Sequence, residues 1–318
     1  MTGKAIDSKV FFDLIVKRES EAKEYKKSQK WEKRKTVLKE YPFFKTLLAY
    51  LSARLRRRGK SQVITHLHDR SRLGTDLALD HYDASERKDL YIREERIAVY
   101  TSLIGPYDTL KEPLLHPDNV DYYIFTDQPI QSGSQWKSLD IRSLLPSGIQ
   151  RDPVACNRWC KFHPHLLFPD YQYSIYIDSN IWVFSDLTPL TASLDSFPVA
   201  MFRHKKRNCV YEEIQACLDQ NKGDRGRLEQ QVDELKALGI PPHWGLLEAS
   251  VIARQHLDPA CVSLMEKWWD SFMLGSGRDQ ISLIECLWRD GIDPYAIGTL
   301  GDNLQRCDLF LQTRHVNE

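Results

Sequence analysis

Three polar residues, Asp178-Ser179-Asn180, follow an apolar run in the middle of the sequence. That run, residues 173–177, is aromatic and β-branched, which favours a buried strand. Side chains that follow a strand lie at the edge where open α/β sheets bind ligands. If strand geometry continues through the triplet, Asp178 and Asn180 share one side, where two oxygens suit a hard divalent cation. The alternative is an ordinary Asx turn, because a second apolar run begins at Ile181.

Two cationic residues precede this strand. Arg158 and Lys161 are three residues apart in a predicted helix over residues 153–168, so they share one helix face. Pro164 is expected to interrupt that helix. An arginine fork and a lysine point charge on one face can hold a diphosphate. The plainer interpretation is a solvated face with ordinary salt bridges.

The segments before this helix predict an α/β domain that begins near Arg96. Residues 97–104 are predicted as a strand, residues 105–108 as a sharp turn, and residues 121–127 as a second strand that ends in the carboxylate of Asp127. Strands that end in polar residues are typical of nucleotide-binding α/β folds. The sequence contains neither the glycine-rich dinucleotide motif nor the P-loop motif, so neither type of site is supported.

Composition limits the class of protein. The chain has 318 residues and 42% hydrophobic content, enough for one large or two modest domains. Its seven cysteines are irregularly spaced, and Cys156 and Cys160 are separated by three residues rather than the two of zinc sites. We therefore expect reduced, buried thiols in a cytoplasmic protein. The sequence has no apolar run of membrane-spanning length and no signal-peptide pattern, so a soluble protein is expected.

The charge is unevenly distributed, although the net charge of the chain is zero. Residues 1–60 contain 18 Lys and Arg against 7 Asp and Glu, so the remainder carries the opposite excess. We predict a basic helical extension and connector over residues 1–90 and a catalytic domain over residues 91–318. An amphipathic helix that ends in Arg56-Arg57-Arg58 suits an anionic membrane surface, a partner helix, or packing on the main domain. Nucleic acid is not expected, because no nucleic-acid reading motif accompanies this charge.

Several motifs occur in a fixed order along the main domain. They are Asn157-Arg158-Trp-Cys-Lys161, His165-Leu-Leu-Phe-Pro169 and Tyr173-Ser-Ile-Tyr-Ile-Asp178, then His204-Lys-Lys-Arg207-Asn-Cys-Val-Tyr-Glu-Glu213, then Gly245-Leu-Leu-Glu248 with Arg254-Gln-His256, and last Trp268-Trp269 with Ser276-Gly-Arg278-Asp279-Gln280-Ile-Ser282. Together they make residues 96–318 resemble the glycosyltransferase-like domain shared by plant mucilage-related and pollen-tube-defect proteins, formerly a domain of unknown function.

The resemblance implies a GT-A-like fold, a single α/β domain around a mixed, mostly parallel sheet that uses a nucleotide-sugar donor. In such enzymes a D-x-D triplet holds a divalent cation against the donor diphosphate, and Asp178 and Asn180 are the corresponding residues here. Asn180 removes one negative charge, yet its oxygen still suits Mn²⁺ or Mg²⁺. Related enzymes often add a histidine ligand near the C-terminus, which makes His315 the third candidate metal ligand.

The other site residues are assigned on the same resemblance. The expected donor-binding residues are Thr101, Tyr107 and Asp127 at the nucleoside, together with Arg158, Lys161, Asp178, Arg207 and Arg278. Glu248 and Asp279 are expected to be catalytic, either by accepting the proton of the acceptor hydroxyl or by holding the acceptor sugar. The structural alternative for Asp279 is a helix cap, because an acid at a helix start complements the dipole. Trp268 and Trp269 are expected in the core rather than at a sugar.

These assignments predict a glycosyltransferase that moves a sugar from a nucleotide-sugar donor to a glycan or lipid-linked glycan acceptor, with a metal ion assisting. The expected setting is surface-polysaccharide synthesis in the cytoplasm, with the basic extension at the inner face of the membrane. Two alternatives stay open. One is a catalytically degenerate scaffold, for which Asn180 is the sequence support. The other is a sugar nucleotidyltransferase, against which the missing glycine-rich phosphate loop argues.

Overall fold

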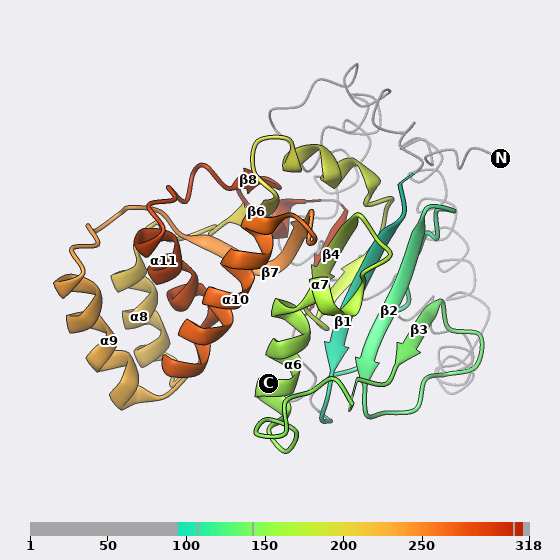
Figure 1. Ribbon diagram of the computed structural model, residues 1–318, viewed down its shortest axis with the longest axis horizontal. Coiled ribbons are helices and arrows are strands. Elements are labelled where there is room, and N and C mark those ends of the chain that lie inside the picture. Colours follow the sequence, from blue (N-terminus) through green and yellow to red (C-terminus); the bar gives the residue numbers. More distant parts are fainter. Residues whose placement is uncertain (1–94, 107, 142, 308, 314–318) are drawn as a thin grey trace, which may run out of the picture. The chain divides into compact units, whose positions relative to one another are not determined.

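A mixed seven-stranded sheet forms the centre of the fold (Figure 1). The computed structural model describes residues 95–106, 108–141, 143–307 and 309–313. The sheet has the strand order β3-β2-β1-β4-β7-β6-β8. The strands are β1 (Ile97–Leu103), β2 (Val120–Thr126), β3 (Trp136–Leu139), β4 (Tyr173–Ile177), β6 (Val199–Arg203), β7 (Leu247–Arg254) and β8 (Gly298–Thr299). Neighbouring strands pair in parallel except at β7, which runs antiparallel to β4 and β6. The predicted α/β fold with a mixed, mostly parallel sheet is confirmed.

The central strands form because their sequences suit burial on both faces. Every residue of β1 and β4 is buried, as expected for near-continuous apolar runs in a parallel sheet. The predicted strand over residues 97–104 ends one residue earlier, and the one predicted over residues 121–127 is found at Val120–Thr126. The carboxyl ends of β1, β2 and β4 therefore meet at one edge of the sheet, where the candidate site residues follow.

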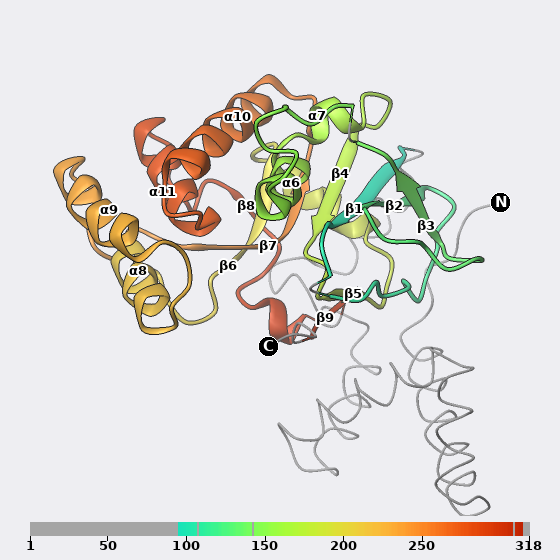
Figure 2. The ribbon, with the colours of Figure 1, turned by 90° about the horizontal axis from the view of Figure 1, so that it is seen from below.

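Helices cover one face of the sheet. They are α6 (Pro153–Phe162), α7 (Pro164–Leu167), α8 (Val210–Asp219), α9 (Arg225–Ala237), α10 (Pro259–Leu274) and α11 (Asp279–Arg289). α6 and α10 pack on the sheet, while α8, α9 and α11 form a group beyond the β6–β7 side in both ribbon views (Figures 1 and 2). The opposite face is covered by the 3-10 helix Thr188–Leu194 and by a small antiparallel pair, β5 (Ile181–Val183) with β9 (Phe310–Gln312). A second 3-10 turn, Leu304–Arg306, precedes β9.

The start and break of α6 follow from its sequence. The carboxylate of Asp152 caps the helix by accepting hydrogen bonds from Val154 N and Ala155 N at 2.9 and 3.1 Å. The helix ends at Phe162, His163 intervenes, and α7 begins at Pro164. The interruption predicted at Pro164 is confirmed, because proline cannot donate the hydrogen bond that would continue the helix.

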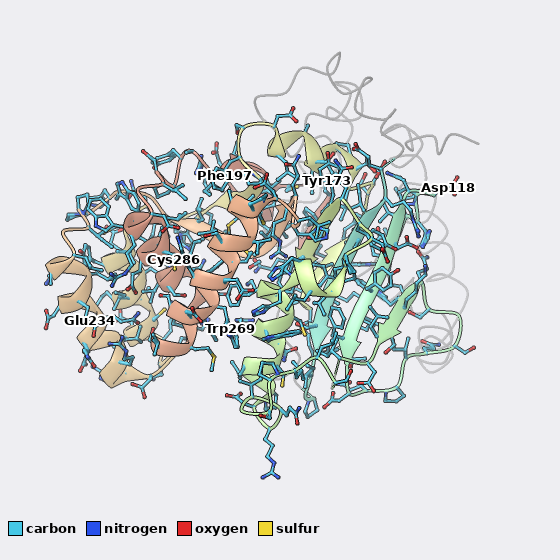
Figure 3. All side chains as sticks on the ribbon, in the orientation of Figure 1. Asp118, Tyr173, Phe197, Glu234, Trp269 and Cys286 are labelled. Atoms are coloured by element: carbon cyan, nitrogen blue, oxygen red, sulfur yellow. The ribbon has the colours of Figure 1, made fainter. Side chains whose placement is uncertain are left out.

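The aromatic pair on α10 belongs to the core, as predicted. Trp268 is wholly buried, and its indole N–H donates to the carbonyl of Asp279 at 2.8 Å. Trp269 packs against Phe162 and His163, between α10 and α6 (Figure 3). Trp268 therefore has no access to a sugar and instead fixes the start of α11, whereas Trp269 is partly buried against the same core.

All seven cysteines are buried and free, as predicted. Within the described ranges, no helix is long and apolar enough to cross a membrane. The helical extension and connector predicted over residues 1–90 lie outside the described residues, as do Tyr107 and His315.

Asn157 on α6 fastens the loop that leaves β1. Its amide oxygen accepts a hydrogen bond from Ile104 N at 3.0 Å, and its amide nitrogen donates to the carbonyls of Ile104 and Pro153 at 3.0 and 2.8 Å. The Asn157 side chain is buried, whereas the backbone groups that it bonds are partly exposed. Asn157 stands in one of the motifs that carry the family resemblance, but its contact with the loop after β1 was not predicted.

We predict that Asn157→Ala lowers the free energy of unfolding by about 2–3 kcal/mol, because it removes three hydrogen bonds made by a buried side chain. Urea denaturation monitored by tryptophan fluorescence measures the loss. Asn119→Ala is the matched control, since the Asn119 side chain makes one bond, to Thr188 Oγ1 at 3.1 Å, and should cost about 1 kcal/mol. Equal losses of unfolding free energy in the two variants would contradict the proposed role of Asn157 in holding the loop after β1.

Candidate functional site

A buried ion pair joins α6 to α11 at the carboxyl edge of the sheet. Lys161 Nζ lies 2.6 Å from Asp279 Oδ2, and both side chains are at least nine-tenths buried. Arg158, one helical turn earlier, places its Nε 3.5 Å from the same oxygen. The prediction that Arg158 and Lys161 share a helix face is confirmed, because both point to one carboxylate. Such a cluster survives burial only if its charges compensate one another.

The electrostatics of this cluster fix the charge on Asp279. Burial acts to raise the pKa of Asp279, but the cations of Lys161, Arg158 and Arg278 outweigh burial and hold that pKa far below its usual range. Asp279 is therefore a permanent anion at neutral pH. Asp279 is also the first residue of α11, where a negative charge complements the helix dipole.

Asp178 lies beside this pair at the end of β4. Its Oδ1 accepts a hydrogen bond from Tyr176 Oη at 3.0 Å and lies 3.7 Å from Lys161 Nζ. The triplet is a turn rather than a continued strand, because Ile181 N donates to the carbonyl of Asp178 at 2.8 Å. The expectation that strand alternation sets the side-chain directions of the triplet is therefore wrong. Tertiary contacts set them instead.

The middle residue of the triplet is anchored to the loop after β1. Ser179 Oγ donates to Asp108 Oδ2 at 3.1 Å, and Lys111 Nζ donates to Asp108 Oδ1 and to the carbonyl of Ser179 at 3.1 and 3.0 Å. Asp108 was predicted only as part of a turn, and Lys111 was given no role. Their partner, Ser179, is about seventy residues away along the chain, so no local sequence pattern predicts the contact.

Asn180 is held by the end of β9. Its Nδ2 donates to the carbonyl of Thr313 at 3.2 Å, and its own carbonyl accepts from Thr313 N and Oγ1 at 2.8 and 3.0 Å. The amide oxygen Oδ1 is buried and has no hydrogen-bond partner among the described residues. An unpaired buried oxygen next to Asp178 fits a cation ligand. No cluster of three or more His, Cys, Asp or Glu able to hold a metal occurs in the described ranges.

Glu248 reaches the same edge because β7 is reversed. Its neighbour two residues on, Ser250, accepts a hydrogen bond from Asp178 N through its carbonyl at 2.9 Å, which joins the start of β7 to the end of β4. Ser250 Oγ also donates to Glu248 Oε1 at 2.8 Å. Burial raises the pKa of Glu248, and the charges of Asp178 and Asp279 raise it further against the opposing effects of Ser250 and Lys205.

Three other predicted residues occupy different surroundings. Thr101 is buried within β1, and its hydroxyl has no hydrogen-bond partner among the described residues. Asp127 accepts from Gly105 N at 3.1 and 3.2 Å and so braces the turn after β1. Arg207 donates to Glu213 Oε2 twice, from Nη2 at 2.5 Å and from Nε at 2.7 Å. The donor-binding roles of these residues stay predictions.

Sequence comparison now identifies the domain. Residues 74–315 match the profile of the TOD1/MUCI70 glycosyltransferase-like domain. The chain belongs to this family. The resemblance found in the sequence is thereby confirmed, and the match begins at residue 74, within the extension and connector predicted over residues 1–90.

One curated member of the family is the "Probable hexosyltransferase MUCI70" of Arabidopsis thaliana. It is 24% identical over 230 residues, which cover 63% of this chain and 39% of the relative. The chain thus spans about two fifths of the length of this relative. A solved structure, the bifunctional glycosyltransferase WbbM in its apo form, is similar with a TM-score of 0.40 and 12% identity over 62% of this chain and 38% of WbbM. A structural likeness this weak carries no argument.

We predict that Asp279→Asn lowers the free energy of unfolding by about 3–5 kcal/mol at pH 7, because Lys161 stays buried without its anion. The carboxylate has a depressed pKa, so its contribution is complete above the unfolded-state value of 3.8 and is lost as the pH falls toward the folded-state value. The penalty should therefore shrink by about 1 kcal/mol between pH 6 and pH 3.

Urea denaturation at several pH values measures both effects. The exposed residue Asp118 supplies the control, since Asp118→Asn should change stability by less than about 0.5 kcal/mol. A penalty for Asp279→Asn that is the same at pH 6 and pH 3 would show that the ion pair does not hold the pKa of this carboxylate down.

Proposed function

We propose that the chain is a glycosyltransferase of the GT-A type that moves a hexosyl or related glycosyl group from a nucleotide-sugar donor to a glycan or lipid-linked glycan. The observation that carries the proposal is the convergence, within a glycosyltransferase-like domain, of Asp178, the Lys161–Asp279 pair and Glu248 at the carboxyl edge of the sheet. Substrates in open α/β folds bind at this edge.

The cations of the site suit the leaving group of the reaction. Glycosyl transfer passes through an oxocarbenium-like state while a nucleoside diphosphate departs. Lys161, Arg158 and Arg278 all act on Asp279 electrostatically, so three positive charges face the carboxylates of Asp279 and Asp178. This excess favours a bound diphosphate and stabilises the charge that develops on it. Asp279 serves to orient Lys161 and Arg158, and its low pKa disfavours the proton-accepting role that the sequence left open.

A divalent cation, Mn²⁺ or Mg²⁺, belongs to the proposal. Asp178 supplies a carboxylate and Asn180 the unpaired amide oxygen. His315 is the third proposed ligand, assigned on the family resemblance, and lies outside the described residues. The ion would neutralise charge on the diphosphate. Of these ligands, Asp178 is additionally oriented by Tyr176.

Glu248 is proposed as the group that accepts the proton of the acceptor hydroxyl. Ser250 Oγ donates to Oε1 and so orients the carboxylate. Its raised pKa moves the carboxylate toward the range in which it can both take and release a proton near neutral pH.

The cellular setting is carried over from the sequence alone. We propose surface-polysaccharide synthesis at the cytoplasmic face of a membrane, with the basic segment of residues 1–60 contacting anionic lipid. Co-sedimentation of the full chain with anionic and neutral vesicles tests the lipid contact, and equal binding to both vesicle types would refute it.

Thermal-shift screening against UDP-, GDP- and CMP-sugars, with and without Mn²⁺ or Mg²⁺, tests the donor and metal assignments. A ligand at about 100 times its Kd should raise the Tm by about 5–10 °C. The shift should depend on the metal and disappear in Asp178→Ala. Asp170→Ala, an exposed acid at the opposite end of β4, should retain it. Absence of any shift in the wild type would favour the non-catalytic scaffold instead.

Replacing Glu248 tests the acid–base assignment. We expect Glu248→Gln to lower kcat by about 10²–10⁴-fold while the nucleotide-dependent Tm shift persists. In the wild type, kcat/KM should fall as the pH decreases through the raised pKa of Glu248, since only the ionised carboxylate accepts a proton. Wild-type kcat in Glu248→Gln would refute this role.

A further inference from the structure

Arg254 on β7 carries a charge that the proposed reaction does not use. The side chain is wholly buried, and none of the ion pairs formed among the described residues joins it to a carboxylate. Instead its guanidinium donates to the carbonyl of Lys161 at 2.7 Å, to the hydroxyl of Tyr100 at 2.5 Å and to Met265 Sδ at 3.3 Å. A buried guanidinium without an anion is costly, so its compensation needs explanation.

The end of α6 provides that compensation. Lys161 lies in the last turn of the helix, where the carbonyls lack intrahelical partners and form the negative end of the helix dipole. Its carbonyl accepts from Arg254 and also from Tyr100 Oη, at 3.2 Å. The guanidinium in addition lies 5.7 Å from the centre of the Tyr100 ring, a cation–π distance. Two buried side chains, Arg254 and Tyr100, therefore donate hydrogen bonds to the carbonyl oxygen of Lys161.

Lys161, whose carbonyl accepts these two hydrogen bonds, also places its ammonium group at the centre of the candidate site. Lys161 Nζ lies 2.6 Å from Asp279 and 3.7 Å from Asp178. It also lies 5.0 Å from the centre of the Tyr176 ring, and Tyr176 packs edge-on against Tyr100 at 5.3 Å. A continuous set of contacts thus runs from Arg254 through Tyr100 and Tyr176 to the carboxylate of Asp178.

We propose that Arg254, together with Tyr100, is a positioning residue that fixes the backbone of Lys161 and so holds its buried charge beside the site proposed for the donor diphosphate. The inference rests on the proposed function. An apolar side chain of similar volume would fill the same space without the desolvation cost of a guanidinium. What the apolar side chain would lack is a directed hydrogen bond to the Lys161 carbonyl. The buried charge of Arg254 is therefore better explained by its role in positioning Lys161 than by its contribution to core packing.

A double-mutant cycle between Arg254→Met and Lys161→Met tests the proposal. The first readout is the Kd of UDP and of GDP, each with Mn²⁺, measured by calorimetry. Lys161→Met should weaken binding by about 10–100-fold, and Arg254→Met by about 5–20-fold, because a displaced lysine keeps part of its attraction. In the Lys161→Met background, Arg254→Met should add less than about a twofold loss.

The control is Arg203→Met. Arg203 also donates to backbone carbonyls, those of Pro294 and Tyr295 at 2.5 and 3.3 Å, but it does not contact Lys161. Its effect on Kd should be the same in both backgrounds. If Arg254→Met causes the same fold-loss with and without Lys161, or leaves the Kd unchanged in the wild-type background, the positioning role is overturned.

A second readout separates this inference from the proposed function. If the wild type binds no nucleotide, the proposed function fails. Urea denaturation of the wild type, the two single variants and the double variant still tests whether Arg254 fixes Lys161. The shift in urea midpoint caused by Lys161→Met should be smaller when Arg254 is already Met, and an unchanged shift would overturn the coupling. Tyr100→Phe removes the other donor to the same carbonyl and repeats both readouts should Arg254→Met fail to fold.

Discussion

The ion pair between Lys161 and Asp279 is the interaction on which the rest of the site depends. It joins residues 118 positions apart in the chain, at 2.6 Å and away from water. A pair in such surroundings is maintained only if every neighbouring charge is accounted for. Arg158 shares the carboxylate, Arg254 fixes the lysine backbone, and Trp268 holds the carbonyl of Asp279. The ion pair joins α6 to α11, and the hydrogen bonds of Arg254 and Trp268 connect it to β7 and α10.

Sheet topology explains why the remaining acids meet this pair. In a purely parallel sheet, the start of β7 would lie at the opposite edge from the end of β4. Because β7 is antiparallel, its first residues and the loop after β6 come to the carboxyl edge. An irregularity in the β6–β7 register sets Glu248 opposite Phe202. The reversed strand therefore brings a carboxylate beside Asp178 that a parallel strand would carry elsewhere.

Local sequence signals were sufficient for the elements but insufficient for the contacts. The apolar runs of β1 and β4, the break at Pro164 and the shared face of Arg158 and Lys161 follow from periodicity and proline chemistry. The partner of that face, Asp279, is distant in sequence, and only the ordered motifs of the family suggested a site there. The direction of Ser179 toward Asp108 had no local signal, and extending strand alternation through the triplet gave the wrong geometry.

The two acids nearest the pair show how environment divides their chemistry. Both Asp279 and Glu248 are shielded from water, and desolvation alone would raise both pKa values. Three cations reverse the effect at Asp279, whereas Glu248 has a serine hydroxyl, the charge of Lys205, and two neighbouring acids that act in the same direction as burial. Carboxyl groups whose pKa values are pushed apart in this way suit different tasks. A permanent anion organises cations, and a carboxylate with a raised pKa is suited to exchanging protons, so the charge pattern supports the proposed role of Glu248 at the acceptor.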